Sequence, residues 1–166
     1  MSITSIGLIS DTHGLLRDAA VEALKGSDWI IHAGDVGKPE IVTVLGRLAP
    51  VTVVKGNIDR GRWASRWPRT AIVEAGPITL FVLHDIHDLD LDPIAAGIQI
   101  VISGHSHQPS RAERCGVLYI NPGSAGPRRF QLPVTVARLD LAVKPCGVTF
   151  IDVSDRYFPP QSRYDP

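Results

Sequence analysis

The first third of the chain alternates short apolar runs with helical patterns. The predominantly apolar runs stand at 3–10, 28–34 and 51–56. Apolar residues recur at helical spacing within 15–26, and Pro39 is well placed as the first residue of a second helix. Buried runs that alternate with helices predict a βαβαβ segment with parallel strands and right-handed crossovers.

The rest of the chain favours strands. Residues 70–85 are typical of two strands joined by a turn, and 98–104 of another buried strand. A short helix is expected at 92–97, with Asp92 as its cap and Pro93 at its first position. From residue 110 onward we expect strands only, at 110–114, 117–121, 134–141 and 148–153. The pattern therefore predicts an α/β domain whose C-terminal part is antiparallel sheet.

The length of the chain bounds its organisation. A chain of 166 residues can bury about 70% of its unfolded surface in one core. There are no internal repeats and no linker-like stretches. We expect a single domain over 1–155, followed by a loose C-terminal tail at 156–166.

Charge and cysteine content narrow the class of partners and the compartment. Lys and Arg together number 17, as do Asp and Glu, so no overall field attracts nucleic acid or an anionic membrane. Two cysteines in no metal-type spacing fit a reducing cytosol. No apolar run is long enough to span a membrane, and the N-terminus lacks the basic region of a signal peptide. These features predict a cytoplasmic protein without a membrane or nucleic-acid partner.

Polar side chains with metal-binding capacity follow the predicted strands. They are Asp11, His13, Asp35, Asn57, His84, His105 and His107. Glycines flank this set and permit tight turns and close backbone approach; they are Gly14, Gly34, Gly56 and Gly104. Because the carboxyl ends of parallel strands form the functional crevice of open α/β sheets, these side chains are expected to converge.

Each of these residues also has an ordinary structural interpretation. Asp11 could cap the helix that follows it, and Asp35 and Asn57 stand in turn-like dipeptides. His84 and His32 could be core histidines with satisfied hydrogen bonds. Four of the six histidines fall within the set, which packing alone does not explain.

The order of the motifs is informative. SDTHG, HAGDV, KGNID, VLHD and SGHSH occur in that order, followed by the loop INPGSAGPRR. Over residues 3–153 this series closely resembles the calcineurin-like metallophosphoesterase superfamily, and in particular its small YfcE-type phosphodiesterase branch. The resemblance implies an α/β fold of two packed mixed β-sheets flanked by helices, an α-β-β-α sandwich.

The resemblance also implies a two-metal site. One ion would be held by Asp11, His13, Asp35 and His107, and the other by Asp35, Asn57, His84 and His105, with Asp35 bridging. Ligands of this kind suit Mn, Ni, Fe, Zn or Mg, of which we favour Mn. The expected reaction is attack of a metal-bound hydroxide on a phosphate ester, with Asp35, Asn57, His84 and His105 as the catalytic residues.

Two positions depart from the superfamily pattern. Ile58 stands where the phosphomonoesterase branches carry a histidine thought to assist the leaving group. Because isoleucine cannot transfer a proton, a phosphodiester or an activated leaving group is favoured over an alkyl monoester. Asp85 stands where many members have glycine, and it could tune metal affinity or turn outward.

Basic residues suggest how a substrate could be bound. Besides Asn57, we expect Arg60 and Arg128 to bind substrate, and His32 and Asp59 to support the metal ligands from behind. The segment 60–69 interleaves arginine with tryptophan, which would suit nucleotide binding, or packing of the tryptophans on the core or on another subunit. The loop at 122–129 could contact phosphate or form a structural turn.

Two functions of different class remain. The favoured one is a metal-dependent phosphodiesterase acting on a small phosphate ester such as a nucleotide. The alternative is a metal-binding interaction scaffold with little catalysis, because the retromer scaffold subunit resembles the same family. The complete set of seven ligand positions favours the enzyme. The oligomeric state is open, and a homo-oligomer fits either function.

Overall fold

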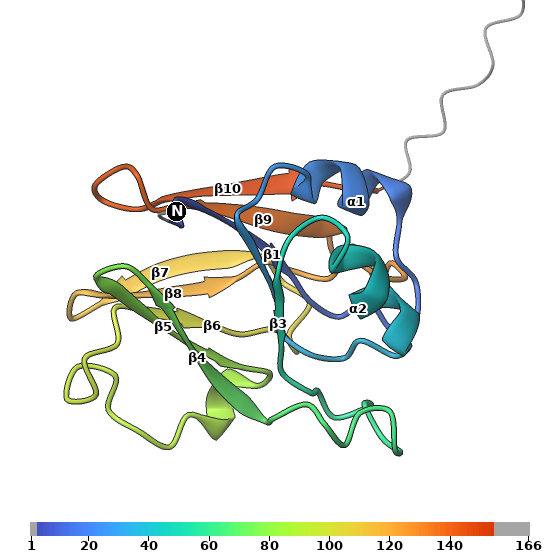
Figure 1. The fold of residues 1–166 in the computed structure, drawn as a ribbon, viewed down its shortest axis with the longest axis horizontal. Coiled ribbons are helices and arrows are strands. Elements are labelled where there is room, and N and C mark those ends of the chain that lie inside the picture. The colour runs from blue at the N-terminus through green and yellow to red at the C-terminus, as the bar shows by residue number, and fades with distance from the viewer. Residues whose placement is uncertain (1–2, 155–166) are drawn as a thin grey trace, which may run out of the picture.

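Two five-stranded β-sheets pack face to face in the computed structural model, which describes residues 3–154 (Figure 1). The first sheet has the order β10-β9-β1-β2-β3. Its strands are β1 (Ser5–Ile9), β2 (Trp29–His32), β3 (Val51–Val53), β9 (Thr135–Asp140) and β10 (Gly147–Asp152). β1, β2 and β3 are parallel, whereas β9 and β10 are antiparallel to their neighbours. The predicted parallel βαβαβ segment is confirmed.

The second sheet is also mixed, with the order β4-β5-β6-β8-β7. Its strands are β4 (Thr70–Ala75), β5 (Ile78–Leu83), β6 (Ile100–Ile102), β7 (Ser110–Arg114) and β8 (Val117–Asn121). β5, β6 and β8 are parallel, and β4 and β7 form antiparallel hairpins at the two edges. Between residues 110 and 154 the structure contains strands and no helix, as predicted.

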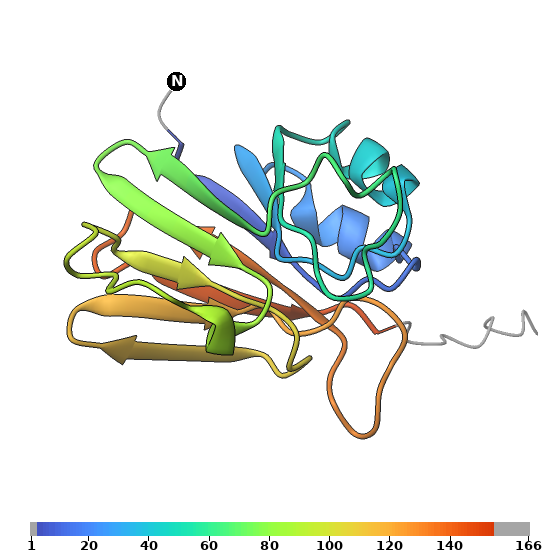
Figure 2. The same cartoon turned by 90° about the horizontal axis from the view of Figure 1, so that it is seen from below.

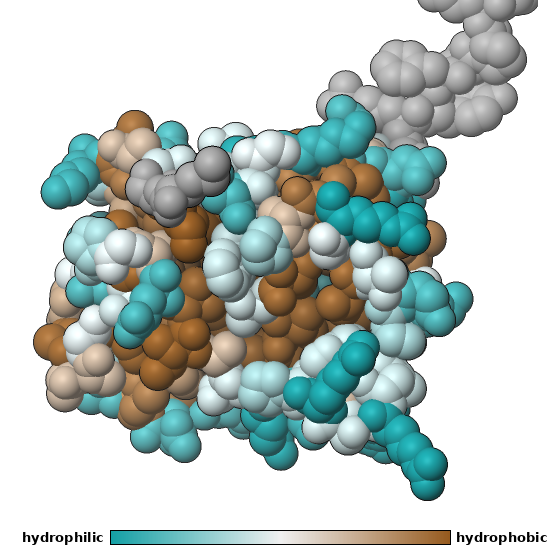
Figure 3. Space-filling view, viewed as in Figure 1, coloured by the Kyte–Doolittle hydropathy of each residue, from teal (hydrophilic) through white to brown (hydrophobic). Residues whose placement is uncertain are grey.

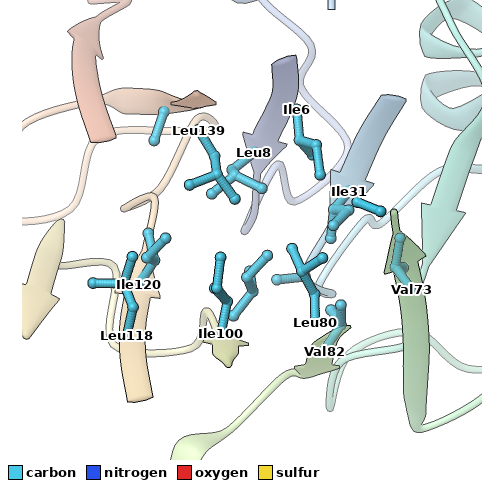
Figure 4. Close-up of a cluster of buried hydrophobic side chains, with 14 of the residues drawn as sticks. Ile6, Leu8, Ile31, Val73, Leu80, Val82, Ile100, Leu118, Ile120 and Leu139 are labelled. Carbon is cyan, nitrogen blue, oxygen red and sulfur yellow. The ribbon is translucent and has the colours of Figure 1, made fainter. Parts of the chain in front are cut away.

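The core lies between the two sheets and follows from alternation along each strand. Figure 4 shows Ile6, Leu8 and Ile31 of the first sheet opposite Leu80, Ile100 and Ile120 of the second. The intervening residues on each strand point to the outer faces of the sandwich. The predicted fold class of two packed mixed sheets is therefore confirmed.

Helices cover the outer face of the first sheet. They are α1 (Asp18–Leu24) and α2 (Pro39–Leu45), which lie together on that face (Figure 2). Leu24 and Leu45 are buried there together with Ile30 of β2. Pro39 is the first residue of α2, as predicted.

Among residues 3–154, no α-helix covers the outer face of the second sheet. The helix expected at 92–97 is a series of turns, in which the Ala96 amide donates to the Asp92 carbonyl and the Ile98 amide to the Pro93 carbonyl. A 3₁₀-helix, η1 (Ile86–Asp88), precedes it. In the described part of the chain, the flanking helices of the predicted sandwich are thus present on one side only.

The two tryptophans of the segment 60–69 pack on the core. Trp67 is buried and Trp63 is half-buried, and they pack edge to face on the core with ring centroids 5.3 Å apart. Packing on the core therefore accounts for these tryptophans.

Figure 3 shows apolar surface over the edge strand β4, where Ile72 is exposed. The predicted tail at 156–166 lies outside the described residues. Within residues 3–154, no helix has the length and apolar character needed to cross a bilayer.

Candidate metal centre

Five strands of the two sheets bring the predicted ligands to one end of the sandwich. Asp11 and His13 follow β1, Asp35 follows β2, Asn57 follows β3, His84 follows β5, and His105 and His107 follow β6. Their side chains form two adjoining groups whose polar atoms lie within hydrogen-bond or ion-pair distance. The convergence expected from the carboxyl ends of the strands is present.

The first group joins Asp11, His13 and His107. The Nε2 atoms of the two histidines are 3.2 Å apart, and Asp11 Oδ1 lies 3.3 Å from Nε2 of His107 and 3.8 Å from Nε2 of His13. Asp11 Oδ2 accepts hydrogen bonds from the Ser10 hydroxyl and from the His105 amide. Oδ1 is buried and accepts no hydrogen bond from the described residues. A buried carboxylate oxygen beside two imidazole nitrogens has the donor chemistry of a divalent metal site.

The second group joins Asp35, Asn57, His84 and His105. His84 Nε2 lies 3.4 Å from Asp35 Oδ2 and 3.1 Å from Asn57 Oδ1. His105 Nδ1 lies 3.2 Å from the same Asn57 oxygen. Asp35 Oδ2 is also 3.7 Å from Nε2 of His13, so this oxygen stands between the two groups. The residues thus offer two neighbouring sets of oxygen and imidazole donors that share one carboxylate.

Burial and the neighbouring charges set the protonation of the centre. Burial acts to raise the pKa of Asp35, but the His84 ring and the Ile58 amide together hold it below its ordinary value. Burial would lower the pKa of His84, yet the Asp35 carboxylate and the Ala33 carbonyl raise it to about 8. Burial lowers the pKa of His13 despite the nearby carboxylates. Asp35 is therefore an anion at neutral pH, as a metal ligand must be.

The backbone of the centre is strained. Seven non-glycine residues of the described chain have positive φ, and five of them are predicted ligands: Asp11, His13, Asp35, His105 and His107. The other two are Cys115 and Phe130. Each such conformation costs about 1–3 kcal/mol and persists where the surrounding structure requires it. Strain concentrated on these five residues points to a functional site rather than to five unrelated turns.

Two of the predicted glycines allow the loops to approach closely. A Cβ on Gly56 would collide with Oδ1 and the backbone nitrogen of Asp35. A Cβ on Gly104 would collide with the Ser10 hydroxyl and lie 2.8 Å from Oδ2 of Asp11. Any larger residue at either position would displace a carboxylate of the centre.

Asp59 and His32 lie behind the predicted ligands, where a supporting role is expected from the sequence. The buried Asp59 carboxylate accepts hydrogen bonds from the backbone amides of Val36 (3.1 Å), Gly37 (2.9 Å) and Gly56 (2.8 Å). Asp59 thereby ties the loop after β2 to the loop after β3. His32 is fully buried, and its Nε2 lies 3.0 Å from the hydroxyl of Thr12, the residue between Asp11 and His13.

A cleft of about 650 Å³ opens beside the second group. Its charged lining residues are Lys55, Arg69, Asp85, Asp88 and Asp90, together with the site residues Asn57, His84 and His105. Arg60 and Arg128, expected to bind substrate, are not in this lining. Arg60 donates to the Asn57 carbonyl, and Arg128 is exposed on the loop that extends from the sheets, orange in Figure 2. Arg69 belongs to the segment 60–69, for which nucleotide binding was one of the expectations. Lys55 was not predicted, although it directly precedes the Gly–Asn motif.

Asp85 lies between the centre and η1. Its Oδ2 lies 3.5 Å from His105 Nε2, and its Oδ1 accepts from the His87 amide and lies 2.9 Å from His87 Nδ1. Partial burial acts to raise the pKa of Asp85, but the hydrogen bonds from His87 hold it below the ordinary value. Because Oδ2 of Asp85 is directed at His105, the side chain faces the site rather than turning outward.

Comparison with known proteins points to one family. A family model of the calcineurin-like phosphoesterase superfamily domain matches residues 4–144. The chain is 35% identical over 148 residues to a probable metallophosphoesterase of Methanothermobacter thermautotrophicus, which covers 81% of this chain and 86% of that protein. It is 39% identical over 134 residues to a probable metallophosphoesterase of Methanocaldococcus jannaschii, which covers 72% and 67% respectively.

Solved structures share the fold. A predicted phosphoesterase of Streptococcus pneumoniae is 25% identical with a TM-score of 0.74, over 96% of this chain and 95% of that one. The E. coli phosphoesterase YfcE is 24% identical with a TM-score of 0.70, over 91% and 94%. Vps29 of Entamoeba histolytica, solved in complex with Zn²⁺, is 20% identical with a TM-score of 0.69, over 90% and 99%. The last two comparisons show likeness of fold alone.

Proposed function

The chain belongs to the calcineurin-like phosphoesterase superfamily, a family of metal-dependent phosphoesterases, and from this premise we propose that it is a binuclear phosphodiesterase. The observation that carries the proposal is the position of Asp35. Its Oδ2 faces a histidine of each donor group, 3.7 Å from His13 Nε2 and 3.4 Å from His84 Nε2. A carboxylate shared by two donor sets suits two ions held close together.

The proposed ligand sets follow the two groups. Asp11, His13, Asp35 and His107 would hold one ion, and Asp35, Asn57, His84 and His105 the other. The unpaired, buried Oδ1 of Asp11 and the absence of thiolate donors suit Mn, Fe, Ni, Zn or Mg, of which we favour Mn. Bound together, two such ions would lower the pKa of a water toward neutrality and offset charge on the phosphate.

The protein's own residues would orient the ester. Asn57 lines the cleft, where its NH₂ group can donate to a phosphate oxygen while its carbonyl oxygen faces His84 and His105. Lys55 and Arg69 line the same cleft and can pair with the negative charge of a phosphate or of an anionic leaving group. The cleft volume of about 650 Å³ suits a ligand of nucleotide size.

The leaving group is constrained by Ile58. Its amide donates to Asp35 Oδ1 at 3.0 Å, while its side chain is 39% exposed and carries no proton-transfer group. An alkoxide that leaves from a phosphate ester needs a proton, whereas an aryl oxide or another leaving group of low pKa does not. We therefore favour a phosphodiester or an activated leaving group over an alkyl monoester.

The test is hydrolysis of bis-p-nitrophenyl phosphate against p-nitrophenyl phosphate by chelated protein, with Mn, Ni, Zn or Mg added back singly. Metal-dependent turnover that favours the diester is expected. Asp35→Asn should lower kcat/KM by more than about 100-fold, because a neutral amide cannot bridge two cations. Asp28→Asn, at the opposite end of the first sheet, should retain activity and serves as the matched control. A fully active Asp35→Asn enzyme would overturn the bridging role.

The second candidate function is an interaction scaffold. It is supported by the shared fold with Vps29 and by the exposed apolar residues Ile72 and Phe130. No turnover with any metal, combined with measured binding of two ions, would favour it. The free cysteines Cys115 and Cys146 agree with a cytoplasmic location for either function.

A further inference from the structure

Asp85 uses its two carboxylate oxygens for different purposes. Oδ1 caps the 3₁₀-helix η1, where it accepts from the His87 amide at 3.0 Å. Capping requires only this oxygen. Oδ2 is directed to the other side and lies 3.5 Å from Nε2 of His105. The side chain is 26% exposed, so its charge is partly shielded from water.

His105 is the most exposed of the predicted histidine ligands, so packing alone does not fix the orientation of its ring. Its side chain is 46% exposed, compared with 7% for His84 and 8% for His107. The His84 ring is fixed because Nδ1 lies 2.8 Å from the Ala33 carbonyl, which leaves Nε2 for the centre. In His105 the roles of the nitrogens are reversed. Nδ1 faces the Asn57 oxygen at 3.2 Å, and Nε2 faces Asp85.

We propose that Asp85 is a positioning residue that holds His105 in the tautomer able to bind a metal. With the proton on Nε2 directed at the carboxylate, the lone pair of Nδ1 faces the centre beside the Asn57 oxygen, as two ligands of one ion would. Without the ion, the Asn57 side chain presents its NH₂ group to Nδ1 instead, because its oxygen can only accept. A carboxylate on the outer nitrogen of a histidine ligand fixes the ring and raises its basicity. This inference rests on the proposed function, because it assigns the Nδ1 atom of His105 to the second ion.

Asp85→Asn separates this role from capping. Asparagine is as good a cap as aspartate, so Oδ1 can still accept from the His87 amide. The cap then turns the NH₂ group toward His105, where it donates to Nε2. The proton of the neutral ring moves to Nδ1, and the nitrogen that faces the centre loses its lone pair.

The matched control is Asp92→Asn. Asp92 also accepts with Oδ1 from the amide two residues on, at 3.0 Å from Ile94, and it is not in the cleft or the centre. Both variants make the same chemical change in the same kind of turn. They differ in the histidines around Asp85. The predicted ligand His105 lies opposite its second oxygen, and His87 Nδ1 lies 2.9 Å from its first.

Two measurements test the proposal. Calorimetric titration of the metal-free proteins with Mn²⁺ should give two sites in wild type and Asp92→Asn. In Asp85→Asn one of the two sites should weaken by about 10- to 100-fold. Nitrogen-15 NMR of the histidine rings at alkaline pH, without metal, should show the Nε2–H tautomer of His105 in wild type and the Nδ1–H tautomer in Asp85→Asn.

The outcomes are distinguishable. If Asp85→Asn keeps both the wild-type Mn²⁺ affinities and the Nε2–H tautomer, Asp85 is a cap and nothing more, and the inference is wrong. If wild type itself does not bind two Mn²⁺ ions, the proposed function fails instead. The NMR result on the metal-free protein still reports whether Asp85 sets the tautomer.

Discussion

At the scale of single residues, both ring nitrogens of His32 have hydrogen-bond partners. The Gly34 amide donates to Nδ1 at 3.2 Å, so the ring proton is on Nε2 and faces the Thr12 hydroxyl. That hydroxyl in turn donates to the Val36 carbonyl at 2.9 Å. A second proton on the ring would break the bond to Gly34. Burial accordingly lowers the pKa of His32 to about 4.

This low pKa predicts an acid sensitivity of folding. The unfolded chain binds a proton at His32 below the ordinary value of 6.5, whereas the folded chain does so only near 4. The free energy of unfolding should therefore fall by up to about 3 kcal/mol as the pH drops through this interval. Urea unfolding of metal-free wild type and His32→Gln from pH 7 to pH 4 measures it. In His32→Gln the free energy of unfolding should fall less steeply with decreasing pH than in wild type. An equal dependence on pH in both proteins would contradict the assignment to His32.

The residues that coordinate metal in the proposal were accessible from sequence, and the residues around them were less so. Asp11 and His13 could be predicted because they form a short motif at the end of an apolar run. Asp85 does not, because whether its second oxygen faces His105 depends on a 3₁₀-turn that no periodicity signals. Arg69 is brought to the cleft by the hairpin that begins at Thr70, a contact set by packing of the second sheet.

At the scale of elements, local sequence signals alone also led to the helix expected at 92–97, where the structure has turns. The Asp92–Pro93 signal is real, since the Asp92 carboxylate accepts from Ile94 and the chain begins a helical turn. Gly97 then adopts a φ of 71°, and Ile98 turns into the core over the second sheet. A single turn fixes several residues for few hydrogen bonds, so it does not extend without a longer apolar face.

Asp59 joins two elements, which leads to a prediction at this scale. Asp59→Ala leaves three backbone amides of the loops after β2 and β3 without their acceptor. Because Asp59 is buried, the expected loss is about 3–5 kcal/mol of unfolding free energy. The loops carry Asp35 and Asn57, so Mn²⁺ affinity should fall as well. Urea unfolding and calorimetric titration measure the two effects.

The matched control for Asp59 is Asp28. Its exposed carboxylate also accepts three hydrogen bonds, from the Thr4 amide and hydroxyl and from the Ser5 amide. It joins the N-terminal ends of β1 and β2, whereas the predicted ligands follow the C-terminal ends of these strands. Asp28→Ala should lower stability to a smaller extent and leave Mn²⁺ affinity unchanged. If Asp59→Ala behaved in the same way, Asp59 would be a structural tie without influence on the centre.

At the scale of the whole molecule, the centre is divided between the sheets. Asp11, His13, Asp35 and Asn57 follow strands of the first sheet, and His84, His105 and His107 follow strands of the second. The hydrophobic pattern predicted the strands of both sheets. The pairing order β4-β5-β6-β8-β7 came only with the structure, because alternation along a strand does not determine which strands are its neighbours.

A centre shared by two sheets predicts that metal stabilises the entire fold. The unfolded chain does not hold these seven side chains together, so ions bind the native state preferentially and raise its stability by mass action. Each site should add about 2.7 kcal/mol when free metal exceeds its Kd 100-fold. Thermal unfolding with Mn²⁺ and then with a chelator measures the gain in Tm. Asp35→Asn should lose most of it, since both ions share that carboxylate, whereas Asp92→Asn should keep it. An equal gain in Tm in both variants would mean that the stabilising ion binds elsewhere on the protein. A metal centre that joins the two sheets would then be contradicted.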